Sequence, residues 1–196
     1  NDLLRTGVLC STAHIEQKQG EYRVDGDPTE VAVLIAAAKA GLTRQKLLRS
    51  YTITGENPFD SKRKCMSVSV RSGHGQQLCC KGAPDVLLDR CSTIQTEQGI
   101  KKLGQRERRE VEAAMAAMAQ NALRVLGFAV SDTPEKGESD LCFLGLMGMQ
   151  DPPRPEVKQA VRKCRSAGIK PVMITGDYRE TALAIAKQTG IAGIND

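Results

Sequence analysis

The sequence has few aromatic residues and no long hydrophobic run. Its 196 residues include three Phe, three Tyr and no Trp, too few aromatics for a platform on which nucleic-acid bases stack. We recognise no signal peptide and no apolar stretch of the roughly 18 residues that a membrane-spanning helix needs. We therefore expect a chain that is soluble as it stands and does not bind nucleic acid.

The sequence also lacks paired cysteine motifs and a strong charge of either sign. Its seven cysteines are odd in number and show no C-x-x-C spacing, which predicts neither a metal site nor a full disulfide framework and suits a reducing cytosol. Cys79 and Cys80 could form a redox pair, or one thiol could be buried and the other exposed. The net charge of +5 gives weak support to binding of polyanions by charge alone.

The central stretch of the chain is predicted to be a β-hairpin. Residues 65–70 alternate apolar and small polar side chains, the two-residue period of a half-buried strand. A turn rich in glycine follows, and residues 77–80 supply the returning strand.

This hairpin would bring Phe59 and the basic residues 62–64 close to Lys81 and Gly82, because residues before its first strand lie beside residues after its second. An exposed aromatic ring next to cations and a glycine is typical of a pocket for a flat base carrying phosphates. The alternative is a solvated basic face with one core phenylalanine. Gly82 could admit a ligand close to the backbone or serve a simple turn.

Residues 27–30 (Asp-Pro-Thr-Glu) predict the start of a helix, with a capping residue, proline at the first helical position and glutamate at the third. Glu30 could close this capping box, or it could lie at the pocket's edge and accept hydrogen bonds from an exocyclic amine. Two polar stretches, through Gly20 and over residues 95–104, are expected to be loops.

Later segments predict a helix from Arg106 and strands over residues 123–130 and 141–149. Arg124 is the only charge in its apolar strand, so it needs an acidic partner or a bound phosphate.

The last fifty residues differ from the rest. Residues 151–155 form a stiff, proline-rich hinge, after which we expect a helix, a strand over residues 169–174 and a final helix, the unit of a parallel α/β sheet. Thr175, Gly176 and Asp177 would follow that strand, where backbone amides and a hydroxyl can hold a phosphate. Alternatively, Asp177 only caps the helix.

Six short motifs together resemble one family. Their order and approximate spacing are similar to those of P-type cation-transporting ATPases, especially the sarcoplasmic-reticulum-like calcium pumps. The motifs are Asp27-Pro28-Thr29-Glu30, Phe59 with residues 63–68, Lys81-Gly82-Ala83-Pro84, residues 123–126, residues 148–154 and residues 173–177.

The resemblance implies an α+β fold in which an antiparallel sheet is flanked by helices. Residues 1–150 would form the nucleotide-binding domain, and residues 151–196 a hinge with a partial α/β phosphorylation domain. The chain would then be part of a cytosolic domain of an integral membrane protein, with the pump's phosphorylation, actuator and membrane domains as partners.

The resemblance also implies roles for individual residues. Adenine would pack on Phe59 near Lys64 and Lys81, with Glu30 by the base and Arg124 toward the phosphates. Gly82 and Arg154 are counted with the ATP-binding residues, and Thr175, Gly176 and Asp177 match the loop beside the phosphorylated aspartate. In the whole enzyme, the γ-phosphoryl of ATP would be transferred to that aspartate with the help of Mg²⁺.

Two features depart from the family's pattern. Ser61 occupies a position where family members often carry arginine, although Lys62 or Arg63 could supply that phosphate contact. The D-K-T-G-T motif with the phosphorylated aspartate is absent. We therefore expect a fragment that binds ATP without hydrolysing it, with Lys81 contributing less than Phe59 if its ammonium is solvated.

Two other functions stay open at this point. The last fifty residues also suggest a haloacid-dehalogenase-like phosphatase, but Asp151 is followed by proline and lacks the D-x-T pattern of such a nucleophile. The second open function is that of a stand-alone nucleotide-binding regulator.

Overall fold

The computed structural model describes residues 2–18, 21–121, 123–150, 153–176 and 179–193. The chain divides into two compact units. The first comprises residues 1–112 and 126–147, and the second comprises residues 113–125 and 148–196.

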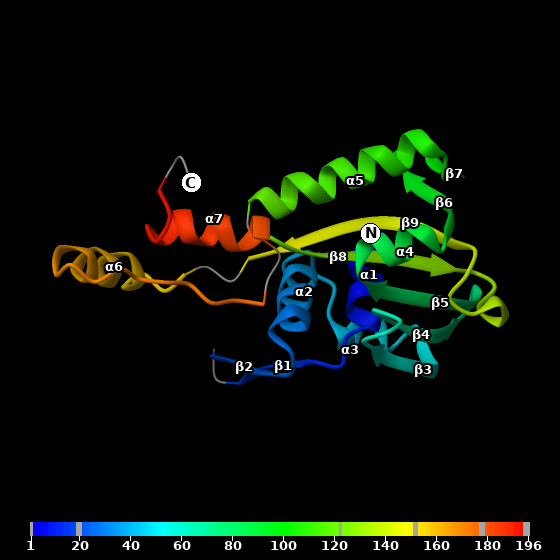
Figure 1. Cartoon of the computed structure of the whole chain (residues 1–196). Helices are drawn as coiled ribbons and strands as arrows, with labels where there is room; N and C mark the ends of the chain where they lie inside the picture. Colours follow the sequence, from blue (N-terminus) through cyan, green and yellow to red (C-terminus); the bar gives the residue numbers. More distant parts are fainter. Residues whose placement is uncertain (1, 19–20, 122, 151–152, 177–178, 194–196) are drawn as a thin grey trace. The chain divides into compact units, whose positions relative to one another are not determined.

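The first unit is built on a seven-stranded sheet with the strand order β3-β4-β5-β8-β9-β6-β7 (Figure 1). Its strands are β3 (Thr52–Asp60), β4 (Cys65–Ser72), β5 (Gly75–Gly82), β6 (Cys91–Thr96), β7 (Gly99–Lys102), β8 (Arg124–Ser131) and β9 (Leu141–Met149). The β3/β4, β4/β5, β5/β8 and β6/β7 pairs are antiparallel, whereas β6 and β9 run parallel. The predicted α+β fold is confirmed, with the parallel β6/β9 pair alongside four antiparallel pairs.

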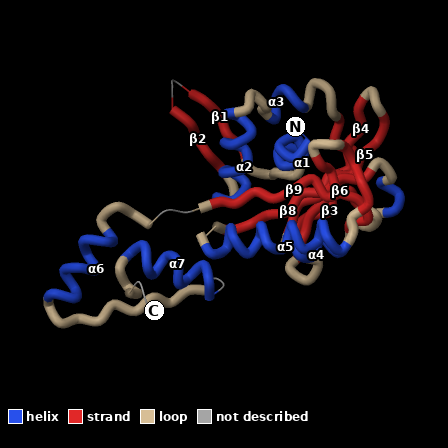
Figure 2. The backbone as a smooth tube through the Cα atoms, turned by 90° about the horizontal axis from the view of Figure 1, so that it is seen from above, coloured by secondary structure: helices blue, strands red, loops and turns tan. Residues whose placement is uncertain are grey.

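Helices cover both faces of this sheet (Figure 2). One face carries α1 (Asp2–Leu9), α2 (Pro28–Lys39) and α3 (Arg44–Leu47), and the other carries α4 (Pro84–Asp89) and the beginning of α5 (Gln105–Gln120). A short 3₁₀ helix, η1 (Pro134–Lys136), lies in the connection from β8 to β9.

The alternation of β4 and β5 divides the core in two. Met66, Val68 and Val70 pack with α1 to α3, whereas Cys65 packs with α4 on the opposite face. Cys79 and Cys80 are both fully buried, one in each core, so the expectation of one exposed thiol is wrong. Burial raises the pKa of the Cys79 thiol to about 11, which keeps it protonated and unreactive near neutral pH.

The predicted central hairpin is confirmed in full register, from Cys65 opposite Gly82 to Ser72 opposite Gly75. Both stretches predicted to be loops contain strands: β1 (His14–Lys18) lies in the first and pairs with β2 (Glu21–Asp25), and β7 lies in the second and pairs with β6. Every residue of β7 is exposed, so no apolar face marks it in the sequence. Its strand geometry comes from hydrogen bonds to β6 alone.

The second unit contains the two helices expected after the proline-rich segment, α6 (Val157–Ser166) and α7 (Arg179–Thr189), with Val161 and Ala186 buried. The strand predicted over residues 169–174 is wrong: this segment is irregular, and Ile174 is 94% exposed. Its apolar residues suit a buried strand, but no described strand pairs with it, and a strand needs a neighbour's backbone groups. Along the described part of the chain, no helix combines the length and apolar character needed to cross a bilayer.

Candidate functional site

One end of the β3-β4-β5 ribbon gathers most of the site residues predicted in the first unit. Asp60 lies opposite Cys65, and Cys65 lies opposite Gly82. The Ala83 amide donates to the Lys64 carbonyl at 2.9 Å, which joins the turn before β4 to the residues after β5. Phe59, Lys64, Lys81 and Gly82 therefore lie at the same end of the sheet, as the hairpin predicted.

Phe59 is displayed by a β-bulge. The β3/β4 register moves from Asn57 opposite Ser67 to Asp60 opposite Cys65, so Pro58 and Phe59 together face Met66 alone. Bulges redirect side chains at functional sites, and the Phe59 side chain is 64% exposed. The alternative of a core phenylalanine is wrong.

The turn after Phe59 carries two exposed cations, Lys62 and Lys64. The Asp60 carboxylate accepts the amides of Lys62 and Arg63 at 2.9 and 2.8 Å. Lys64 has a positive φ of 53°, and its amide donates to the Asp60 carbonyl at 2.6 Å. The side chains of Lys62 and Lys64 are exposed to solvent, so an anionic ligand can reach their ammonium groups.

Arg63 in the same turn has a different role. Its guanidinium donates from Nη2 to the carbonyls of Asn57, Pro58 and Cys65. These internal contacts leave Lys62 as the exposed cation next to Ser61, where the family's pattern often has arginine.

Lys81 and Glu30 form a buried ion pair below this end of the sheet. Lys81 is only 7% exposed, and its Nζ donates to Glu30 Oε1. The smaller contribution expected of Lys81 assumed a solvated ammonium, and that assumption is wrong. The charge is paired inside the protein, where screening by salt is weak.

Glu30 also joins α2 to the segment after α1. As predicted, Asp27 caps α2 by accepting the Thr29 amide at 2.8 Å. The Glu30 carboxylate, at the third helical position, reaches outside its own helix. Its Oε2 accepts the Thr12 amide at 2.8 Å, the Thr12 hydroxyl at 2.9 Å and the Ala13 amide at 2.8 Å.

These donors set the ionisation of Glu30. Burial raises its pKa, but the hydrogen bond and charge of Lys81 and the Thr12 and Ala13 donors outweigh burial, so the pKa lies below its ordinary value of 4.5. A carboxylate whose pKa is lowered by folding stabilises the fold above that ordinary value and loses this contribution as the pH falls through the folded-state pKa.

Gly82 is required by the protein's own packing. A Cβ atom at this position would lie 2.5 Å from the Lys64 carbonyl oxygen and 2.6 Å from Cys65 Cβ. The absence of a side chain lets the β3–β4 turn close against β5. Neither use considered from the sequence, close approach to a ligand or a simple turn, describes this contact.

The remaining predicted site residues belong to the second unit. Arg124 is the first residue of β8, whose first two residues belong to the second unit, and it is exposed. Arg154, Thr175 and Gly176 are exposed in irregular segments near α6 and α7. Asp177 lies outside the described residues.

Sequence reasoning missed a cluster centred on Glu138, in the connection between β8 and β9. The side chain of Glu138 is 10% exposed. Burial raises its pKa, but hydrogen bonds from Ser67, Cys65 and Arg90 and the charge of Arg63 lower it below its ordinary value. Oε1 accepts from Ser67 Oγ at 2.7 Å and Asn57 Nδ2 at 3.3 Å, and Oε2 contacts Arg90 Nη1 at 2.7 Å, Cys65 Sγ at 3.3 Å and Arg63 Nε at 3.3 Å.

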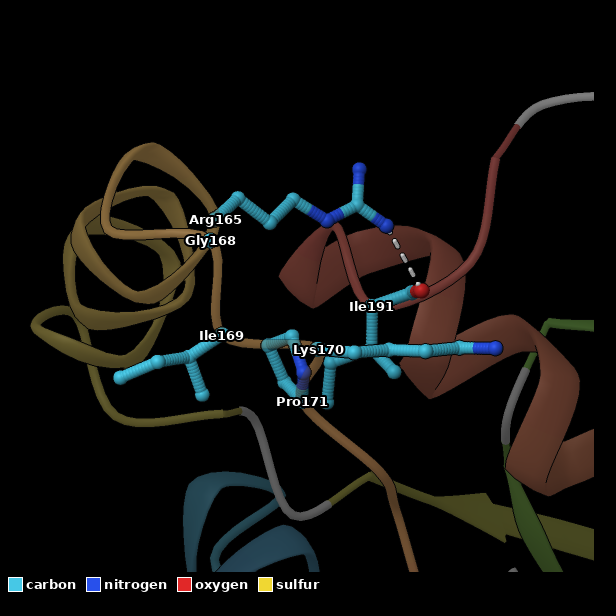
Figure 3. A pocket seen from close by; sticks show the side chains of 6 residues that line it. All are labelled: Arg165, Gly168, Ile169, Lys170, Pro171 and Ile191. Carbon is cyan, nitrogen blue, oxygen red and sulfur yellow. Dashed lines mark hydrogen bonds between the residues drawn. The ribbon is translucent and has the colours of Figure 1, made fainter.

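The second unit has a hollow of about 250 Å³ beside α6 (Figure 3). Arg165 crosses it and donates to the Ile191 carbonyl at 2.9 Å. The hollow carries no aromatic side chain and holds none of the predicted site residues. Among the described residues, no group of three His, Cys, Asp or Glu side chains could hold a metal ion.

Comparison with known proteins gives a match over most of the chain. Residues 1–156 match the family model described as P-type ATPase, cytoplasmic domain N. A calcium-transporting ATPase of Bacillus subtilis is 46% identical over 193 residues, which cover 94% of this chain and 22% of that protein.

Other relatives carry different names. A cation-transporting ATPase of Synechocystis is 40% identical over 100% of this chain and 22% of its own length. A sodium/potassium exporting P-type ATPase of Schizosaccharomyces pombe is 38% identical over 96% of this chain and 19% of its own length. The chain thus spans about a fifth of the length of these relatives.

Proposed function

Because the chain belongs to the P-type ATPase family and most of it matches cytoplasmic domain N, we propose that it binds ATP at the exposed end of the β3-β4-β5 ribbon. The observation that carries this proposal is the Phe59 ring, 64% exposed on a bulge that is followed directly by the turn with the exposed Lys62 and Lys64. An exposed aromatic ring offers a flat apolar face, and a purine has a matching flat face that can stack on it.

In this proposal the residues divide the nucleotide between them. Adenine stacks on Phe59, and the exposed ammonium groups of Lys62 and Lys64 attract the phosphates. The Lys81–Glu30 pair lies on the side of the site where the base binds. Lys81 Nζ carries three donors, and its contact with Glu30 uses one of them. Arg124, toward the phosphates, and Arg154 are further proposed ATP-binding residues.

For the whole protein we propose an ATP-driven cation pump. This chain would position ATP so that its γ-phosphoryl reaches an aspartate outside these 196 residues. Mg²⁺ bound with the nucleotide would neutralise phosphate charge. We take residues 1–150 as the nucleotide-binding domain, and residues 151–196, with Thr175, Gly176 and Asp177, as a hinge and part of the phosphorylation domain.

Calcium is the proposed transported ion, by similarity to the Bacillus subtilis relative. No described residue argues for a particular cation, and the relatives' names include other ions. We further propose that the chain faces the cytosol in an integral membrane protein whose other domains are its partners.

Calorimetric titration of the chain with ATP, GTP and inorganic triphosphate tests the binding proposal. We expect weak binding that favours ATP over GTP, persists without Mg²⁺ and is accompanied by no hydrolysis, because the site reads the base. A merely basic surface would bind all three ligands equally and release them in salt. Equal affinities would therefore refute the proposal.

A further inference from the structure

The bulge that displays Phe59 lacks part of the usual strand pairing. Two residues of β3, Pro58 and Phe59, face one residue of β4, and proline has no amide hydrogen to give to the ladder. The carbonyls of Asn57 and Pro58 are held instead by the guanidinium of Arg63. The backbone immediately before Phe59 is thus fixed by a side chain from the following turn.

Arg63 is itself held by Glu138. Its Nε lies 3.3 Å from Glu138 Oε2, and the carboxylate is almost enclosed, at 10% exposure. Glu138 Oε1 also accepts the Asn57 side-chain amide at 3.3 Å. Glu138 is therefore linked to the bulge in two ways. It binds the side chain of Asn57, the residue before Pro58, and it binds Arg63, which in turn binds the carbonyls of Asn57 and Pro58.

The other contacts of Glu138 anchor it to the rest of the unit. Arg90, at the end of α4, donates to Oε2 at 2.7 Å, and the Ser67 hydroxyl of β4 donates to Oε1 at 2.7 Å. One carboxylate thus lies between two guanidiniums, and its removal would leave Arg63 and Arg90 without their shared counter-charge.

We propose that Glu138 is a positioning residue for recognition of the base: through Arg63 it holds the bulge in the geometry that presents Phe59. This inference rests on the proposed ATP-binding function. Glu138 would thus affect ATP binding without touching the nucleotide.

A double-mutant cycle separates positioning from a general structural role. Glu138→Gln keeps an oxygen for Ser67 and Asn57 but turns an amide donor toward the two guanidiniums, which are donors themselves. The cycle combines Glu138→Gln with Phe59→Ala, and Glu110→Gln is the matched control because Glu110 pairs with Arg106 on the exposed side of α5. ATP and inorganic triphosphate are titrated against each chain at a temperature where unfolding curves show it to be folded.

We expect Glu138→Gln to raise the Kd for ATP roughly threefold to tenfold and to leave triphosphate binding unchanged. In the Phe59→Ala background the same substitution should have no further effect on ATP. Arg63→Lys should reproduce the effect of Glu138→Gln, because an ammonium cannot span the Asn57 and Pro58 carbonyls as a guanidinium does. Glu110→Gln should match the unsubstituted chain.

Three outcomes would overturn the inference: ATP affinity unchanged in Glu138→Gln, equal losses for ATP and triphosphate, or the same loss with and without the Phe59 ring. Failure of the proposed function would look different, because the unsubstituted chain itself would then bind ATP no better than triphosphate.

Discussion

At the scale of single residues, the Lys81–Glu30 pair is the least expected arrangement. A lysine in a basic stretch is usually solvated, yet Lys81 is enclosed and paired with the glutamate of the best-marked helix start in the sequence. Because β5 continues to pair with β8 up to Gly82, the Lys81 side chain points from a central strand into the protein. Its charge must therefore be matched by a buried partner.

Replacing Lys81 by methionine should destabilise the fold by roughly 1–3 kcal/mol at pH 7, because it leaves the enclosed Glu30 carboxylate without its cation. The loss should shrink as the pH falls below 4.5, the ordinary pKa of the group, since a protonated Glu30 needs no counter-charge. Urea unfolding at pH 7 and pH 3.5 measures both effects.

Lys101→Met is the control, because Lys101 pairs with Glu107 but is 46% exposed, and exposed pairs contribute roughly 0–1 kcal/mol. An equal effect of the two substitutions, or a Lys81→Met effect independent of pH, would show that the burial of the pair has no energetic consequence.

At the scale of elements, the sequence predicted the strands and helices whose own residues show a clear local pattern. The alternation over residues 65–70, the cap at Asp27 and the apolar run over residues 141–149 lie in β4, α2 and β9 with nearly the expected bounds. In each case local chemistry and tertiary burial agree, so one strand or helix can be recognised without its neighbours.

Elements that depend on a neighbour were not predictable. β7 is a strand only because β6 pairs with it, whereas the apolar residues 169–174 lack a described pairing strand and stay irregular. The site follows the same rule. Phe59 and Lys64 could be named from the hairpin, but Glu138 comes from a polar connection more than 70 residues away in sequence, and only the fold brings it to Ser67.

Gly82 carries a prediction at this scale, because it lets the β3–β4 turn approach β5. Gly82→Ala would place a Cβ atom 2.5 Å from the Lys64 carbonyl oxygen, so backbone must move. We expect a loss of roughly 1–3 kcal/mol in unfolding free energy together with weaker ATP binding.

Gly55→Ala in β3 is the matched control, because its nearest neighbour, Ser69 Cβ, is an ordinary 3.8 Å away. Unfolding curves and ATP titrations compare the two variants. A Gly82→Ala chain as stable as Gly55→Ala would mean that the turn closes without needing this glycine.

At the scale of the whole molecule, the two units differ in how much backbone pairing they contain. The first holds a seven-stranded sheet between two cores, whereas the segment between α6 and α7 exposes Val172 and Ile174 without strand pairing among the described residues. Unpaired, exposed backbone belongs to the least protected parts of a fold.

Hydrogen exchange should therefore be fast over residues 169–176 and slow in β4 and β5, whose amides are paired on both sides. Mass spectrometry of peptides from both regions measures the contrast in one sample. Similar protection in both regions of a monomeric chain would contradict this view of the second unit.

The central claim is that the chain reads adenine through Phe59, and the change in ATP affinity on replacing Phe59 by alanine tests it most directly. Loss of a stacking ring costs roughly 1–3 kcal/mol of binding free energy, so we predict that Phe59→Ala raises the Kd for ATP about 5- to 150-fold. Ile100→Ala is the control, because Ile100 is also 64% exposed but lies on β7, and it should bind ATP as the unsubstituted chain does. If Phe59→Ala also binds ATP with unchanged affinity, the nucleotide does not bind where this account places it.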